Sequence, residues 1–216
     1  MLKALLFDLD GTLVDSEPLK AEAIAMAFQE LGYSVSADVY KEVMGQSWEN
    51  VLKHFCEKAR AQITEAEFNA IFRNHYQKLI SEKVQMKSDL VGFLDFAMSL
   101  NLQMAVVSSA SSWMVDGILS KLSLDKYFSL VITQQDVSKH KPDPEAYLVA
   151  LQKLGITADE ALVFEDSEAG VQAAKAAGCQ CIAIRHNFNE RHQFSHALKV
   201  LNSFEAAESI VAAFKK

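Results

Sequence analysis

Two aspartates near the N-terminus are the first residues in this sequence whose spacing could do chemistry. Asp8 and Asp10 stand in the segment 7–13, Phe-Asp-Leu-Asp-Gly-Thr-Leu, at the end of the apolar run 4–9. Side chains alternate along a strand, so both carboxylates would emerge on one side at its carboxyl end, where open α/β sheets bind ligands. Two close carboxylates repel each other, and a divalent cation relieves the repulsion; ligands that are all oxygen favour Mg²⁺. The alternative is a surface turn in which Asp10 only shapes the backbone.

Hydroxyls and basic groups follow later apolar runs. Ser108 and Ser109 end the run 102–107, and their hydroxyls could donate hydrogen bonds to phosphate oxygens or cap the next helix. The segment 139–144, Lys-His-Lys-Pro-Asp-Pro, gathers basic groups in an otherwise acidic chain. Its two prolines stiffen the backbone, which suits holding the ammonium of Lys141 in place, although a solvated loop is also open.

A second acidic pair closes another apolar run. Glu165 and Asp166 follow the run 161–164, and Ser167 comes next. Asp166 or Ser167 could simply cap the following helix. Taken with the other groups, however, the acids, hydroxyls and basic loop are the set that Mg²⁺ and a phosphate dianion require.

Short apolar strands that alternate with helices must position these residues. The pattern predicts strands over 4–9, 102–107, 130–133, 161–164, 179–184 and 198–201, with helices over 111–122, 144–154, 168–177 and from about 203 onward. Alternation of this kind is typical of a parallel sheet covered on both faces. We therefore expect an α/β fold with a doubly wound, Rossmann-like core.

The first crossover of this core is unusually long. Almost 90 residues separate the first two strands, and the periodicity between them predicts only helices, over 17–31, 36–44, 47–59 and 64–83. A βαβ crossover needs far fewer residues. We therefore predict an inserted α-helical cap domain over 15–87, with the catalytic core formed by 1–14 and 88–216.

The composition of the chain narrows its class. Half of the 216 residues are hydrophobic, and 21 Lys and Arg stand against 28 Asp and Glu, for a net charge of −7. The short N-terminal apolar run breaks at Asp8, unlike a signal peptide or a membrane span. An acidic protein surface repels the phosphate backbone of nucleic acids. We expect a cytoplasmic protein, a monomer or weak homodimer, with no nucleic-acid or membrane partner.

The ordered motifs resemble those of the haloacid dehalogenase (HAD) superfamily of phosphohydrolases. They are Asp8-x-Asp10-Gly-Thr, Ser108, Lys141-Pro and Glu165-Asp166. The helical insertion after the first motif is similar to the subclass with a small α-helical cap. Dehalogenase activity is disfavoured, because dehalogenating members lack the second aspartate of the first motif.

The resemblance implies a mechanism. Asp8 would attack phosphorus and form an aspartyl-phosphate, while Asp10 would protonate the leaving group and later deprotonate the attacking water. Ser108 and Lys141 would neutralise the transferring phosphoryl group. The resemblance further implies a Mg²⁺ site formed by Asp8, Asp166 and the main-chain carbonyl of Asp10, with Glu165 either a ligand or one step removed.

Substrate choice is expected to depend on the cap. The candidate substrate-binding residues are Ser109, Lys20, Gln46, Trp48 and Arg73. Trp48 could equally pack inside the cap, and Lys20 and Arg73 could be solvated charges. The β-phosphoglucomutases resemble the chain in layout, but they usually carry His at the position of Lys20 and Arg at that of Trp48, which weakens a mutase interpretation.

The histidines show no metal-binding spacing. His192 and His196 are four residues apart, but no acid or cysteine completes a site, so we expect a solvated segment there. The sequence therefore predicts a Mg²⁺-dependent phosphatase acting on a small phosphorylated metabolite such as a sugar phosphate. The alternatives are a sugar-phosphate mutase and, less favoured, a non-catalytic binding protein.

Overall fold

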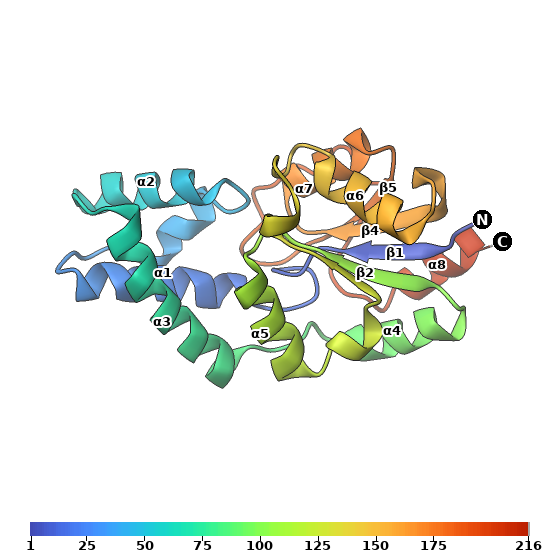
Figure 1. Ribbon diagram of the computed structural model, residues 1–216, viewed down its shortest axis with the longest axis horizontal. Coiled ribbons are helices and arrows are strands. Elements are labelled where there is room, and N and C mark those ends of the chain that lie inside the picture. The colour runs from blue at the N-terminus through green and yellow to red at the C-terminus, as the bar shows by residue number, and fades with distance from the viewer. Residues whose placement is uncertain (216) are drawn as a thin grey trace.

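The computed structural model describes residues 1–215, which form a parallel sheet with its helices and a helical lobe at one end (Figure 1). Lys216, the last residue of the predicted core domain, lies outside the described residues. The strands in the described part of the chain are β1 (Ala4–Phe7), β2 (Gln103–Val107), β3 (Leu130–Ile132), β4 (Ala161–Glu165), β5 (Gln180–Ile184) and β6 (Lys199–Leu201). They match the predicted strands to within two residues at each end.

The strand order places the switch point of the sheet beside β1. The order is β3-β2-β1-β4-β5-β6, and every neighbouring pair is parallel. The chain builds outward from β1 through β2 and β3, and then returns to the other side through β4. Ligands of doubly wound sheets bind at the carboxyl ends of the strands where this reversal occurs. The predicted fold class is therefore confirmed.

Both faces of the sheet are covered, which explains why the strands are continuous apolar runs. The helices of this part are α4 (Leu90–Ser99), α5 (Ser112–Leu122), α6 (Glu145–Leu154), α7 (Glu168–Ala176) and α8 (Ala207–Lys215). Leu5 and Phe7 belong to the apolar cluster that includes α4, α5 and α8, whereas Ala4 and Leu6 belong to that of α6 and α7. Alternate residues of β1 thus anchor opposite layers, which lie on opposite sides of the sheet in Figure 1.

The inserted segment forms the helical lobe seen at one end of Figure 1. It contains α1 (Glu17–Glu30), a 3-10 helix (Ala37–Glu42), α2 (Trp48–Ala59) and α3 (Glu65–Lys83). Thr64 and Glu67 form a capping box that starts α3. The helix expected over 36–44 is only the short 3-10 segment, a form used in pieces of a few residues. We call this lobe the cap.

The two connections between the cap and the sheet run side by side. The Asp15 amide donates to the Gln85 carbonyl at 2.9 Å, and the Lys87 amide donates to the Leu13 carbonyl at 2.9 Å. The Lys87 ammonium also pairs with the Asp15 carboxylate. The predicted cap boundaries at 15 and 87 lie in this paired segment.

Candidate active site

The carboxyl ends of three adjacent strands bring the sequence-predicted residues together. Asp8 follows β1, Asp166 follows β4 and Ser108 follows β2, and all three are buried. The Asp8 amide donates to Phe164 in β4, which holds the first residue beyond β1 in strand-like register. The Ser108 hydroxyl accepts from the Ala110 amide at 3.0 Å, so its own hydrogen can be donated to a ligand.

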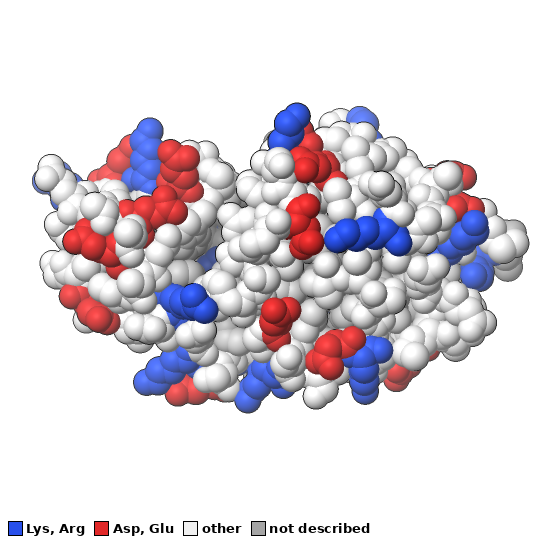
Figure 2. All heavy atoms as spheres, viewed as in Figure 1, with Lys and Arg blue, Asp and Glu red and all other residues white. Residues whose placement is uncertain are grey.

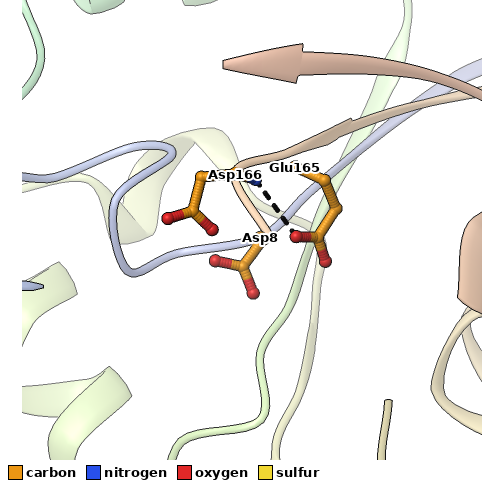
Figure 3. Close-up of side chains that lie close together, drawn as sticks. All are labelled: Asp8, Glu165 and Asp166. Carbon is orange, nitrogen blue, oxygen red and sulfur yellow. Dashed lines mark hydrogen bonds between the residues drawn. The ribbon is translucent and has the colours of Figure 1, made fainter. Parts of the chain in front are cut away.

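Three carboxylates converge at this edge of the sheet. Asp8, Glu165 and Asp166 each offer an oxygen within 4.8 Å of the other two, and Figure 3 shows them turned toward one another. Burial raises the pKa of Asp8 and of Asp166, and neighbouring carboxylates raise both further, with Lys141 opposing the shift at Asp8. Close, buried, repelling carboxylates are a donor set that suits a hard divalent cation.

Lys141 is the buried cation of the site. Its ammonium donates to Asp8 Oδ1 at 2.8 Å, to Glu165 Oε1 at 2.6 Å and to the Val107 carbonyl at 2.8 Å. Burial disfavours the ammonium, but the charges of Asp8 and Glu165 outweigh this and raise the pKa of Lys141. Lys141 therefore stays charged at neutral pH and orients the Asp8 carboxylate.

Glu165 is saturated by hydrogen bonds from the protein. Its Oε1 accepts from Lys141 and from the Tyr147 hydroxyl at 2.7 Å, while its Oε2 accepts from the amides of Asp166 and Ser167 and from the Ser167 hydroxyl. A Cβ at Gly170 would lie 1.9 Å from this carboxyl group, so the close approach of α7 requires glycine there. Both oxygens of Glu165 are therefore engaged by donors of the protein, one of which is Lys141.

Asp10 lies where the core meets the cap. Its Oδ1 accepts from the Ser16 hydroxyl at 2.5 Å and from the Tyr76 hydroxyl, on α3 of the cap, at 3.4 Å. The Lys20 ammonium lies 3.4 Å from the same oxygen. Gly11 has a φ of 77°, and a Cβ there would lie 2.1 Å from Asp166 Oδ2, so only glycine allows this turn beside Asp166.

His186, to which the sequence assigned no role, contacts Asp166. Its Nε2 lies 2.8 Å from Asp166 Oδ2, and its Nδ1 accepts from the Phe188 amide at 3.2 Å. Nε2 must then carry the hydrogen and donate it to Asp166. Burial, reinforced by the charge of Lys87, lowers the pKa of His186 to about 4, so the ring is neutral. His196 is exposed as expected, but His192 is half-buried with its Nδ1 unpartnered among the described residues.

The predicted substrate-binding residues fall into three environments. Ser109 and Gln46 are exposed. The Lys20 side chain is only 12% exposed and pairs with Asp10 and with Glu17 Oε1 at 2.9 Å, so the solvated alternative for Lys20 is wrong. Burial disfavours its charge, but Asp10 and Glu17 raise the pKa of Lys20.

The other two cap candidates make packing contacts. The Trp48 ring centroid lies 4.7 Å from that of Phe72, and its indole N–H donates to Asn69 at 2.7 Å. Arg73 is exposed, and its guanidinium lies 4.7 Å from the ring centroid of Trp113, the second residue of α5. Trp48 thus helps to join α2 to α3, and Arg73 joins the cap to the core.

The sequence did not predict that several further residues would contribute to the site. They are Ser16, Glu17, Tyr76, Tyr147, His186 and Asn189, the last donating to the Asp166 carbonyl at 2.8 Å. Ser16 and Glu17 had a usable signal, because two polar residues precede Pro18 just after the acidic motif. The tyrosines and His186 sit in ordinary helical or loop sequence and carried no such signal.

The surface shows no concentration of positive charge on the face drawn in Figure 2, where Lys and Arg are scattered among acidic residues. The same view shows the surface indented between the cap and the core. Among residues 1–215, no helix is long and apolar enough to cross a membrane.

Comparison with known proteins identifies the family. Residues 5–184 match the family model described as haloacid dehalogenase-like hydrolase. The phosphorylated carbohydrates phosphatase of Thermotoga maritima is 30% identical over 88% of each chain, and the phosphoglycolate phosphatase of Yersinia pestis is 30% identical over 87% of this chain and 83% of its own. The crystal structure of CbbY from Rhodobacter sphaeroides in complex with phosphate is 25% identical, covers 94% of this chain and 95% of its own, and has a TM-score of 0.85. The chain belongs to the haloacid dehalogenase-like hydrolases.

Proposed function

We propose that the chain is a Mg²⁺-dependent phosphatase that hydrolyses a small phosphomonoester, of the sugar-phosphate kind, through an aspartyl-phosphate on Asp8. The observation that carries the proposal is the buried Asp8 carboxylate, held by Lys141 on one side and faced by Asp166 on the other. Both curated relatives described above are named phosphatases of small metabolites.

The residues divide the chemistry between them. An oxygen of Asp8 forms a bond to phosphorus while the bond from phosphorus to the leaving oxygen breaks, and Asp10 gives its proton to that oxygen. A water then attacks phosphorus, Asp10 takes its proton, and the bond to Asp8 breaks to release phosphate. Ser108 donates a hydrogen bond to the transferring group, and the positive charge of Lys141, held beside Asp8, offsets the negative charge of its oxygens. Glu165 and Tyr147 hold Lys141 in place rather than touching substrate.

Asp8 and Asp166 would hold the Mg²⁺, together with the main-chain carbonyl of Asp10 that the family resemblance implies. The positive charge of the ion would offset the negative charge of the phosphoryl oxygens. His186 and Asn189 fix Asp166 through its carboxylate and its carbonyl, respectively. Outer partners of this kind orient the ligands of a metal.

A screen of phosphorylated metabolites for released phosphate tests the proposal. We expect turnover with Mg²⁺, loss of turnover in a chelator, poor recovery with Ca²⁺, which accepts looser coordination, and loss of turnover in Asp8→Asn with the fold intact. Full activity in the chelator or in Asp8→Asn would overturn the mechanism. A sugar bisphosphate that triggers isomerisation without phosphate release would instead indicate a mutase, and turnover of no phosphate ester would indicate a binding protein.

A further inference from the structure

Glu17 carries a buried carboxylate oxygen that has no hydrogen-bond partner among residues 1–215. Glu17 is the first residue of α1 and is 5% exposed. Its Oε1 accepts from Lys20 Nζ at 2.9 Å, but its Oε2 is buried and has no hydrogen-bond partner within the described part of the chain. An unsatisfied buried acceptor is costly, so a group that donates a hydrogen bond is expected at this oxygen.

The position of Glu17 points to the leaving group of the substrate. The Lys20 ammonium bridges Glu17 and Asp10, the residue that would protonate the leaving oxygen. The charge of Glu17 also contributes, after burial, to the raised pKa of Asp166. Glu17 therefore lies in the first turn of α1 in the cap and shares its ammonium partner, Lys20, with Asp10.

We propose that Glu17 is a specificity residue whose free oxygen accepts a hydrogen bond from a hydroxyl of the leaving group. The inference rests on the phosphatase function proposed above and names its substrate class: phosphate esters whose alcohol part is uncharged and carries several hydroxyls. The single ammonium of Lys20 is shared between Glu17 and Asp10, so it only partly offsets the negative charge of Glu17. A leaving group that carries a carboxylate, such as glycolate, would be repelled there.

Three small phosphate esters that differ in the group next to the ester carbon separate these effects. Glycerol 3-phosphate carries a hydroxyl on the carbon next to the ester carbon, ethyl phosphate carries only hydrogen there, and 2-phosphoglycolate carries a carboxylate. In wild-type protein with Mg²⁺, we expect kcat/KM to fall in that order. In Glu17→Gln, kcat/KM for glycerol 3-phosphate should fall by about 10- to 100-fold, the range for a hydrogen bond to a charged group. Ethyl phosphate should change little, and 2-phosphoglycolate should improve.

A defect in proton donation by Asp10 gives a different pattern, because Glu17 and Asp10 share Lys20. All three esters have alkoxide leaving groups, so such a defect would lower kcat/KM for all of them alike. Glu22→Gln is the matched control: Glu22 lies on the same helix, is 41% exposed and pairs with Lys83. This control should leave the three values as in wild type.

Two results would overturn the inference. One is an equal change for the three esters in Glu17→Gln, and the other is a wild-type preference for 2-phosphoglycolate over glycerol 3-phosphate. The second needs no variant, so it applies even if Glu17→Gln fails to fold, which thermal unfolding would reveal. If the wild-type protein releases phosphate from no ester, including p-nitrophenyl phosphate, the proposed function itself has failed; turnover without the expected ranking rejects the role of Glu17 alone.

Discussion

Removal of the Lys141 ammonium should destabilise the metal-free protein strongly. Lys141→Met keeps the length and apolar stem of the side chain but leaves Asp8, Glu165 and the Val107 carbonyl without their donor. The Lys141 side chain is 6% exposed and that of Glu165 is 0% exposed. Breaking a buried ion pair by removing one partner costs about 3–5 kcal/mol. In a chain of this size that loss lowers the melting temperature by about 6–20 °C.

The assay is thermal unfolding in a chelating buffer at neutral pH, followed by circular dichroism and tryptophan fluorescence so that a single transition can be verified. The control is Lys153→Met, because the Lys153 side chain is 48% exposed and lies 3.5 Å from Asp136. An exposed pair contributes at most about 1 kcal/mol. A melting temperature for Lys141→Met as close to wild type as that of Lys153→Met would refute the reasoning.

The pH dependence adds a second check on Lys141. The raised pKa of Lys141 means that its contribution to wild-type stability is complete below the unfolded value of about 10.4 and is lost as the pH rises past the folded value. In Lys141→Met, burial raises the pKa of Asp8 without the opposing charge of Lys141, so the folded state binds a proton at Asp8 more readily than the unfolded state does and its stability should rise as the pH falls. Addition of Asp8→Asn to this variant should recover part of the loss at neutral pH.

Three further predictions concern the metal and the cap. Mg²⁺ at about 100 times its dissociation constant should raise the free energy of unfolding by about 2.7 kcal/mol, and an equal rise in Asp166→Asn would contradict the metal site. His186→Gln should weaken Mg²⁺ binding about 10-fold or more in the same titration, and His196→Gln, at an exposed residue, should not. Trp48→Ala should cost about 2–3 kcal/mol in urea unfolding, because its half-buried ring packs on Phe72; a loss below about 1 kcal/mol would contradict that packing.

The sequence by itself determined the sheet and the places where chemistry could occur. A parallel sheet buried on both faces requires apolar strands, so β1, β2, β4 and β5 are readable as short runs, and the polar residue after each run must lie at the carboxyl edge. Asp8, Ser108 and Asp166 were located in this way. The long helical interval between the first two strands likewise showed that a cap is inserted.

Only the tertiary structure decided which side chains meet. Lys141 contacts Asp8 across 133 residues of sequence, and Tyr76 of the cap reaches Asp10 across 66. Periodicity predicts the face on which a residue lies but not its distant partners, which depend on loop paths and on how the cap packs against the core. Two such features are the hydrogen bonds that saturate Glu165 and the Glu17 oxygen that has no partner in the described part of the chain, because both depend on a buried carboxylate together with its neighbours.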